Sequence, residues 1–303
     1  MSERMPKLLL GLIGAGIQRS LTPALHEEEG RARGLRVHYQ LIDLAAAHAS
    51  VDVLPTLIAA ARVMGFAGLN ITFPCKQAVI PLLDELSPDA AAMGAVNTVV
   101  FRDGRAVGHN TDASGWRYGF ERDLPGADLS RVVLLGAGGA GSAIAHALVQ
   151  MQGGRGELLI VDADLVRAEA LARDLGSRQP AGRVRPAAFA SDAMRGASGL
   201  VHATPTGMDK MPGLPLDASA LDASMWVSEI VYFPLETALV TTARARGCRV
   251  ADGSGMAVGQ AVGAFELFTG HAADRARVEA HFRSLIAPAT RPGATASPMP
   301  AAA

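Results

Sequence analysis

One glycine-rich hexapeptide limits the folds open to this chain more than any other stretch of its sequence. GAGGAG at 136–141 follows the apolar run RVVLL and precedes SAIAHALVQ, a pattern typical of an amphipathic helix. Gly136, Gly138 and Gly141 fit the G-x-G-x-x-G spacing, which permits a tight turn between a strand and a helix. Such a turn lets backbone N–H groups approach a pyrophosphate, whose charge the helix N-terminus favours. The stretch predicts a dinucleotide-binding turn, and a turn needed only for close packing is the alternative.

We assign all six residues of this turn to cofactor binding: Gly136, Ala137, Gly138, Gly139, Ala140 and Gly141.

Two aspartates follow the next predicted strand. ELLIVD ends with Asp162, roughly 20 residues beyond the glycines, where the second strand of such a unit meets the adenosine ribose. Its carboxylate can accept hydrogen bonds from both ribose hydroxyls of NAD. The 2′-phosphate of NADP would be repelled, because two unit charges about 4 Å apart at an effective dielectric of about 20 interact with about 4 kcal/mol. Asp162 therefore predicts NAD as the cofactor.

The carboxylates and arginines near this strand end also allow other roles. Asp162 could be a solvated turn acid, or Arg155 or Arg167 could fold toward a 2′-phosphate and favour NADP. Asp164 directly precedes LVRAEALARDL, and we expect its side chain to cap that helix.

The rest of the chain alternates between strand-like and helix-like segments. LLLGLIG, VHYQLIDL and GFAGLNIT alternate with PALHEEEGRARG and LPTLIAAARVMG, which is typical of an α/β domain with a mostly parallel sheet. We expect a substrate-binding domain over 1–112, completed by helices over 252–287, and a Rossmann-type dinucleotide-binding domain over 113–251, with a cleft between them. The tail 288–303 is rich in Pro, Ala and Thr, so we expect it to be disordered.

Composition excludes several classes of function. A formal net charge of -1 without a long basic run argues against a nucleic-acid partner. Cys75 and Cys248 lack metal-ligand spacing, which argues against a structural metal and for buried thiols in a reducing compartment. The uncharged stretch 132–154 is rich in glycine and suits a strand, a turn and a helix better than a membrane span. We therefore expect a cytoplasmic protein with no membrane partner.

Polar clusters end several apolar runs of the first predicted domain. They are SLTPALH (20–26), GLNITFPCK (68–76), GAVNT (94–98) and GHNTD (108–112). Ligands of α/β sheets collect at strand ends. Hydride transfer from an alcohol without a metal needs one side chain to take the hydroxyl proton and polar groups to orient the substrate. The Lys, Asp, Asn, Ser and Thr residues of these clusters can supply both.

In combination, these motifs resemble the shikimate dehydrogenase family over nearly the whole chain. SLTP, NITFPCK, GAVNT, NTD, GAGGAG, ATPTGM, VYFPLET and DGSGMAVGQA stand in the family's order. The resemblance implies oxidation of a ring alcohol of quinate or shikimate to the 3-dehydro acid with a nicotinamide cofactor, by a monomer or homodimer. It also implies that Lys76 and Asp112 are the catalytic pair, with Lys76 as the proton acceptor. A plain ion pair between the two domains is the alternative.

The same resemblance supplies the other site residues. For the substrate carboxylate it implies Ser20 and Thr22, although Ser20 could also cap the helix that follows. For the ring hydroxyls it implies Asn70, Thr72, Asn97 and Gln260. Tyr232 would border the substrate and the nicotinamide. On the cofactor side we place Thr204, Pro205, Gly253 and Met256, although Met256 could also simply fill a packing gap.

Three positions depart from the family's pattern. Members that use NADP resemble one another in an Asn-Arg-Ser/Thr run after the second strand, whereas residues 162–164 here read Asp-Ala-Asp. The chain therefore looks like the NAD-preferring quinate/shikimate dehydrogenase branch. His202 replaces the usual Asn before Ala-Thr-Pro; its imidazole could replace the hydrogen bonds of the amide or could titrate, and the sequence does not decide between the two. Gly259 replaces a bulkier residue before Gln260, from which we expect a looser helix face and a wider substrate pocket.

Three other functions compete with NAD-dependent oxidation of quinate or shikimate. An NADP-dependent biosynthetic shikimate dehydrogenase is disfavoured by Asp162, and an aminoshikimate-type dehydrogenase would use the altered pocket near Gly259. A non-catalytic sensor of quinate or shikimate would need no proton acceptor, so Lys76 and Asp112 argue against it.

Overall fold

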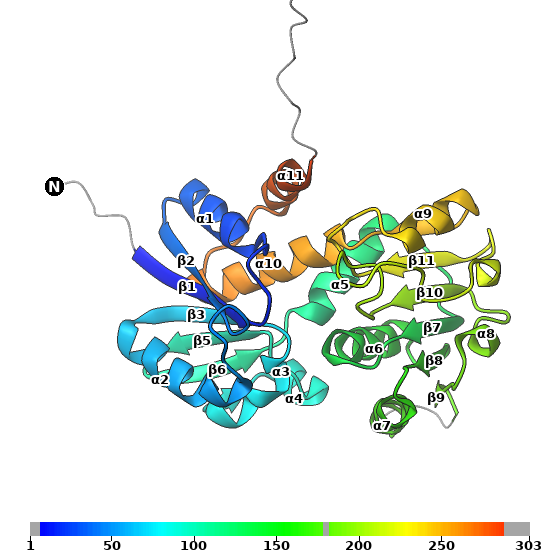
Figure 1. The fold of residues 1–303 in the computed structure, drawn as a ribbon, viewed down its shortest axis with the longest axis horizontal. Helices are drawn as coiled ribbons and strands as arrows, with labels where there is room; N and C mark the ends of the chain where they lie inside the picture. Colours follow the sequence, from blue (N-terminus) through cyan, green and yellow to red (C-terminus); the bar gives the residue numbers. More distant parts are fainter. Residues whose placement is uncertain (1–6, 178–181, 288–303) are drawn as a thin grey trace, which may run out of the picture.

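A computed structural model describes residues 7–177 and 182–287, which form two α/β lobes (Figure 1). Each lobe is built on a six-stranded sheet in which most neighbouring strands run parallel. The predicted fold class, two α/β domains with mostly parallel sheets, is confirmed. The tail predicted to be disordered, 288–303, lies outside the described residues.

The sheet of the first lobe contains one antiparallel strand. Its strands are β1 (Lys7–Gly14), β2 (Arg36–Asp43), β3 (Phe66–Ile71), β4 (Glu85–Leu86), β5 (Thr98–Arg102) and β6 (Arg105–His109), in the order β2-β1-β3-β5-β6-β4. β5 runs antiparallel to β3 and β6. Asp103 and Gly104 join β5 to β6 with φ angles of 51° and 75°. Asp-Gly is a favoured sequence for two-residue hairpin turns, because both positions need a positive φ.

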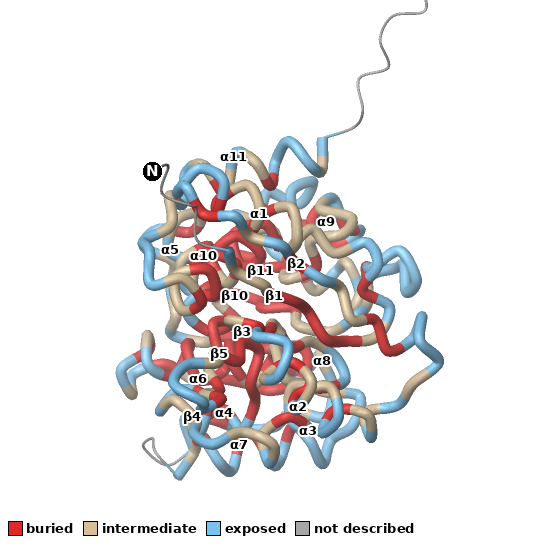
Figure 2. Tube along the Cα trace, turned by 90° about the vertical axis from the view of Figure 1, so that its left-hand side faces the viewer, coloured by how far each residue is buried: buried red, intermediate tan, exposed pale blue. Residues whose placement is uncertain are grey.

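Helices cover both faces of this sheet. The lobe's own helices are α1 (Thr22–Ala32), α2 (Leu54–Met64), α3 (Cys75–Ala78) and α4 (Pro88–Met93), with 3-10 turns at Val51–Val53 and Ile80–Leu82. Two helices from the end of the chain, α10 (Ser254–Thr269) and α11 (Arg275–Ile286), complete it. Phe268 of α10 packs over Gly68 of β3, where a Cβ would lie 2.1 Å from the phenyl ring. Figure 2 shows that the central strands β1, β3 and β5 are largely buried, whereas β2 is more exposed.

The second lobe has a fully parallel sheet. Its strands are β7 (Arg131–Leu135), β8 (Glu157–Val161), β9 (Val184–Pro186), β10 (Gly199–His202), β11 (Trp226–Glu229) and β12 (Arg249–Ala251), in the order β12-β11-β10-β7-β8-β9. Its helices are α6 (Gly139–Gln152), α7 (Leu165–Gly176), α8 (Ala190–Ala193) and α9 (Ala238–Ala245), with a 3-10 turn at Ala218–Ala220. This is the doubly wound order, whose direction reverses between β7 and β10. Ligands of such sheets bind beyond the carboxyl ends of the strands at that point.

Two helices connect the lobes and cross at glycines. α5 (Asp112–Asp123) packs along α10, and both run between the two sheets (Figure 1). A Cβ at Gly115 would lie 2.5 Å from the backbone N of Gln260, and a Cβ at Gly259 would lie 2.7 Å from Cα of Gly115. The missing side chain at Gly259 therefore brings α10 close to α5. Our expectation of a looser helix face and a wider pocket at Gly259 is wrong, because the space is filled by the backbone of α5.

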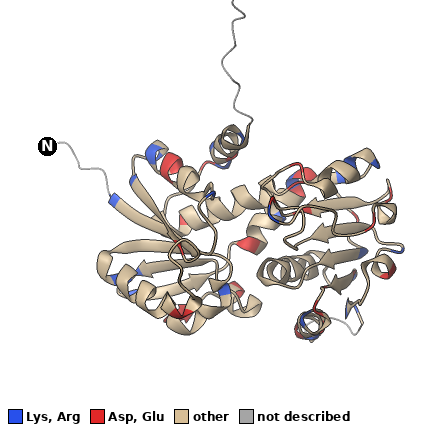
Figure 3. Ribbon diagram, in the orientation of Figure 1, with Lys and Arg blue, Asp and Glu red and all other residues tan. Residues whose placement is uncertain are grey.

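Charged residues of both signs are spread over the helices and loops of both lobes (Figure 3). Cys75 and Cys248 are buried free thiols, as predicted. Within 7–177 and 182–287, no helix has the length and apolar character needed to span a bilayer.

Candidate active site

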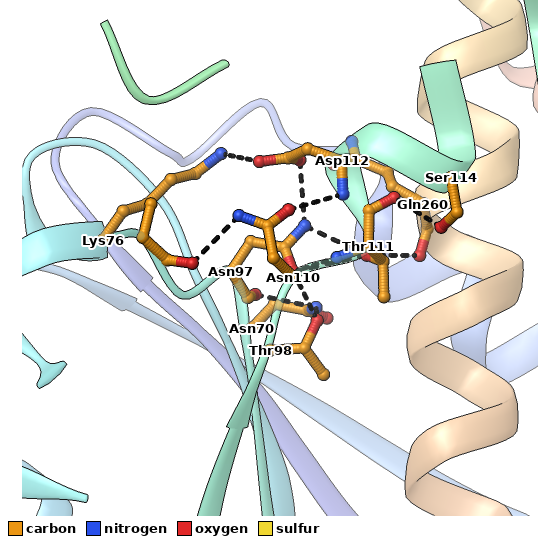
Figure 4. Close-up of polar contacts among 10 residues, drawn as sticks. Asn70, Lys76, Asn97, Thr98, Asn110, Thr111, Asp112, Ser114 and Gln260 are labelled. Atoms are coloured by element: carbon orange, nitrogen blue, oxygen red, sulfur yellow. Dashed lines mark hydrogen bonds and ion pairs between the residues drawn. The ribbon is translucent and has the colours of Figure 1, made fainter. Parts of the chain in front are cut away.

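A lysine and an aspartate meet where α3 and α5 approach each other (Figure 4). Lys76 Nζ donates to Asp112 Oδ2 at 2.5 Å. The Asp112 side chain is only 1% exposed, whereas that of Lys76 is 19% exposed. Asp112 is the first residue of α5, where a negative charge is favoured by the helix dipole. The pair therefore consists of a fixed, buried carboxylate and a lysine amino group that solvent or a ligand can still reach.

The Asp112 carboxylate is held by neighbours besides Lys76. Asn97 Nδ2 donates to Asp112 Oδ1 at 2.9 Å and to Thr111 Oγ1 at 3.0 Å. Asn97 Oδ1 accepts from the Thr111 N–H and from the Thr98 hydroxyl, each at 2.9 Å. Because an amide has two N–H donors and two lone pairs, Asn97 is fully used within the protein. It positions Asp112, and a contact with a ring hydroxyl would require one of these bonds to be exchanged.

A second amide is oriented from below by a buried tyrosine. Tyr39 OH donates to Asn70 Oδ1 at 2.7 Å, while Asn70 Nδ2 donates to Thr98 Oγ1 at 3.2 Å. Burial raises the pKa of Tyr39, so the phenol stays a neutral donor. Nothing in the strand-like segment VHYQLID signalled this role, because the contact joins β2 to β3 across the sheet.

The remaining predicted substrate residues lie on other segments of the chain. The Ser20 and Thr22 hydroxyls are 3.0 Å apart, at the start of α1. Ser20 is not the capping residue of α1, since Leu21 holds that position, but its Oγ accepts from the Thr22 N–H at 3.3 Å. Thr72 follows β3, and the Gln260 carbonyl accepts from Thr111 Oγ1 at 3.2 Å. Each assignment to substrate stays a prediction.

The glycine turn has the geometry that a pyrophosphate requires. Gly136 has a φ of 103°, and a Cβ at Gly141 would lie 1.9 Å from the Gly136 carbonyl oxygen. Gly138 is the N-cap residue of α6, and a Cβ placed there would have no heavy atom within 4 Å. Two glycines thus allow the tight turn, while the third leaves open space at the N-terminus of a 14-residue helix. These residues fit a dinucleotide phosphate group.

Asp162 is fixed beside this turn. Its Oδ2 accepts from the Ala137 N–H at 2.7 Å, and its Oδ1 accepts from the Asp164 N–H at 2.9 Å. Arg167 lies 3.1 Å from Asp162 and 3.3 Å from Asp164. Asp164 caps α7 by accepting from the Val166 N–H, which confirms that prediction. Arg167 thus contacts both carboxylates here.

The other predicted cofactor residues lie in two places. Thr204 and Pro205 follow β10, and a Cβ at Gly136 would lie 3.1 Å from Cγ2 of Thr204. Gly253 lies against the exit of β11, since its Cβ would lie 2.4 Å from the Val231 carbonyl oxygen. Met256 is 8% exposed and packs in the core of the second lobe. Its packing role is therefore visible, and its contact with a cofactor stays a prediction.

The two halves of the site face each other. A Cβ at Gly139 would lie 3.5 Å from Cδ of Lys76, so the lysine stem lies against the glycine turn. Arg19 of the first lobe pairs with Asp209 of the second at 2.8 Å, and its guanidinium stacks 3.9 Å from the Phe233 ring centroid. The catalytic pair predicted from the first lobe is thus adjacent to the dinucleotide turn of the second.

Some functional candidates were missed by the sequence reasoning. Asn110 Oδ1 accepts from the Asp112 N–H at 2.9 Å, and Asn110 Nδ2 donates to the Ala95 carbonyl at 3.0 Å. Asp43 accepts from the N–H groups of Gly16 and Ile17, which anchors the loop that leads to Ser20. Asn110 stood in the GHNTD motif and could have been found there. In the part of the chain that the structure describes, no cluster of His, Cys, Asp and Glu could hold a metal ion.

The comparisons with known proteins agree on one family. Residues 12–99 match the family model described as "Shikimate dehydrogenase substrate binding domain", and residues 253–281 match "Shikimate 5'-dehydrogenase C-terminal domain". A shikimate dehydrogenase (NADP(+)) from Streptomyces avermitilis is 54% identical over 91% of this chain and 95% of its own length. A quinate/shikimate dehydrogenase (NAD(+)) from Corynebacterium efficiens is 49% identical over 92% of this chain and 98% of its own length.

A solved structure of the same family is similar throughout. Quinate dehydrogenase from Corynebacterium glutamicum in complex with NAD superposes with a TM-score of 0.85 and is 47% identical, covering 92% of this chain and 99% of that one. These relatives are all named as dehydrogenases of shikimate or quinate, and their names divide between the two nicotinamide cofactors.

Proposed function

We propose that this chain, which belongs to the shikimate dehydrogenase family, oxidises quinate or shikimate to the 3-dehydro acid with NAD. The family consists of oxidoreductases that act on a CH–OH group with a pyridine nucleotide. One observation carries the proposal more than any other. Lys76 is hydrogen-bonded to buried Asp112 and lies against Gly139 of the dinucleotide turn. A proton acceptor and a hydride acceptor can therefore reach the same carbinol.

The proton path uses this chain's own residues. We infer that Lys76 Nζ reacts as the neutral amine, whose lone pair takes the substrate hydroxyl proton, because it is the more exposed member of the pair. Asp112 holds the lysine in place through Oδ2, while Asn97 fixes the other carboxylate oxygen. The bound nicotinamide supplies the hydride acceptor. Ser20 and Thr22 would hold the substrate carboxylate through their adjacent hydroxyls.

The preference for NAD rests on Asp162. Its carboxylate is fixed by the N–H groups of Ala137 and Asp164, so it cannot easily turn away from a ribose bound at the turn. A 2′-phosphate would approach this negative charge. Arg167, whose side chain is 57% exposed, could leave Asp162 for a 2′-phosphate, which is the specific route to NADP use. The division among relatives makes this the point that most needs an experiment.

We also propose that the residues 1–112 with 252–287 bind the substrate and that 113–251 bind the cofactor. The polar cluster around Asp112 and the glycine turn at 136–141 support this division.

The test is initial-rate formation of NADH or NADPH with purified protein, crossing NAD and NADP with quinate and shikimate. Turnover with NAD on either acid would support the proposal, and the ratio of the two acids would assign the preferred substrate. A strong preference for NADP would overturn the role given to Asp162. No turnover with any pair would favour an altered ring substrate or a sensor.

A further inference from the structure

His202 and Glu229 form a buried polar pair in the second lobe that the reaction above does not use. They are direct neighbours in register at the carboxyl ends of β10 and β11. Both side chains are 0% exposed, and His202 Nδ1 lies 2.8 Å from Glu229 Oε1. Replacing both partners of a buried hydrogen bond by apolar groups of the same shape can be nearly neutral or stabilising, so stability alone does not explain such a pair.

Glu229 gathers donors from three segments. Its Oε1 accepts from His202 and from the N–H groups of Ile230 and Val231, at 2.8 and 3.0 Å, just before Tyr232. Its Oε2 accepts from the Thr237 hydroxyl at 3.0 Å, and Thr237 in turn caps α9. A buried polar network that is fully satisfied rigidifies the parts that it joins. Glu229 therefore fixes the loop that carries Tyr232.

His202 transmits this order to the loop after β10. Its Nε2 lies 2.5 Å from Thr204 Oγ1. In the neutral ring, Nδ1 carries the hydrogen that Glu229 accepts, so Nε2 is an acceptor for the Thr204 hydroxyl hydrogen. The Thr206 N–H also donates to Thr204 Oγ1, at 3.3 Å. One lone pair of Thr204 Oγ1 then remains for a donor on the ligand side.

We propose that His202 and Glu229 are positioning residues that set Thr204 as a hydrogen-bond acceptor for the nicotinamide nucleoside half of the cofactor. The inference rests on the proposed function, since it needs a nicotinamide nucleotide at the turn beside Thr204. A carboxamide N–H or a ribose hydroxyl of that half is the matching donor. His202, which stands where the family usually has Asn, acquires a role in this way.

Two substitutions separate the two nitrogens of His202. In His202→Asn the amide nitrogen takes the place of Nδ1 and still donates to Glu229, but nothing reaches Thr204. In His202→Gln the terminal amide reaches toward Thr204, and the Nδ1 contact is lost. Thr241→Val is the matched control, because it removes a threonine hydroxyl that donates to the Thr237 carbonyl at 3.0 Å on α9 without touching the pair.

The experiment is calorimetric titration of each folded variant with NAD and with ADP, which lacks the nicotinamide nucleoside half. We expect His202→Asn to bind NAD about tenfold more weakly, the loss of about one hydrogen bond, with ADP affinity unchanged. Combining it with Thr204→Val should add no further loss beyond Thr204→Val alone. Thr241→Val should bind both ligands like the wild type.

Two results would overturn the inference: NAD affinity in His202→Asn equal to that of the wild type, or a parallel loss of ADP affinity, which a merely structural role would produce. If His202→Asn unfolds, His202→Gln is titrated instead: its terminal amide still reaches toward Thr204, so we expect it to bind NAD like the wild type, and a tenfold loss of NAD affinity with unchanged ADP affinity would overturn the inference. Binding needs no turnover, so a protein that binds NAD but oxidises neither acid would refute the proposed substrate and leave this test intact. If NADP binds better than NAD, the same comparison is made with NADP and 2′-phospho-ADP. A wild type that binds no nicotinamide nucleotide would refute both proposals.

Discussion

The glycines at which α5 and α10 cross give a prediction in which a substitution lowers activity much more than stability. In Gly115→Ala the new Cβ would lie 2.5 Å from the backbone N of Gln260, 3.0 Å from C of Gly259 and 3.1 Å from Cα of Gln260. Ordinary contacts lie at about 3.5–4.0 Å, so the helices must separate by about 1 Å. Overpacking of this kind costs about 1–3 kcal/mol, while alanine regains about 1 kcal/mol of helix propensity.

The free energy of unfolding should therefore fall by only about 0–2 kcal/mol, a shift in Tm of a few degrees. Turnover should fall far more, because α5 begins with Asp112 and α10 carries Gln260. A displacement of about 1 Å at catalytic groups can cost about a hundredfold in rate. The assay is NADH formation at saturating substrates, together with thermal unfolding of the same samples.

The control is Gly176→Ala at the end of α7, where a Cβ would have no heavy atom within 4 Å. This variant should keep full activity and gain stability. If Gly115→Ala keeps turnover within about threefold of the wild type, the helix crossing does not set the catalytic geometry and our reasoning fails.

Three further predictions concern single side chains. Lys76→Met keeps the side-chain stem against Gly139 but removes the proton acceptor. Turnover should therefore fall about 10²–10⁴-fold, while NAD affinity, measured by titration, stays unchanged. An equal loss of NAD affinity would count against the role of Lys76 as proton acceptor. Asp162→Asn keeps an oxygen that accepts from the Ala137 N–H and removes the negative charge. In steady-state assays, kcat/KM with NADP should rise about tenfold or more. No rise would mean that charge repulsion does not select NAD over NADP. Burial lowers the pKa of His26 from 6.5 to about 4. As the pH falls, the unfolded chain binds a proton at His26 before the folded protein does, which favours unfolding. The free energy of unfolding therefore shows no loss from His26 above about pH 6.5 and falls by about 3 kcal/mol as the pH drops to 4. Urea unfolding measures the free energy of unfolding at pH 5 and at pH 7. The difference between these two values should be smaller for His26→Leu than for the wild type, and equal differences would refute the assignment.

Local patterns predicted much of the fold and part of the candidate site. The G-x-G-x-x-G spacing places its glycines where a positive φ and a close approach occur, because those constraints act within six residues. The cap of α7 by Asp164 follows from equally local chemistry. Lys76 and Asp112 lie 36 positions apart, and only the family resemblance suggested that they meet.

Contacts between distant segments could not be read from the sequence. The Tyr39 hydroxyl on β2 reaches Asn70 on β3 across the intervening strand β1. No local pattern in the sequence specifies this strand order. Gly259 appeared to loosen its helix, because its partner Gly115 comes from a helix about 140 positions earlier in the chain. The sharing of Asn97 between Asp112 and Thr111 likewise depends on the folded arrangement.

The covering of the first sheet by α10 has a consequence for how the protein is made. Leu10, Leu12 and Val100 form a core with Ala264 and Phe268, which are synthesised much later. The strands of the first lobe are synthesised first, yet part of one face of their sheet stays uncovered until α10 arrives. The sheet of the second lobe, by contrast, lies within 131–251 and has its helices beside it in the chain. We expect ribosome-bound chains that have emerged from the exit tunnel only as far as residue 254 to resist protease in the second lobe and not in the first, so that the order of folding reverses the order of synthesis.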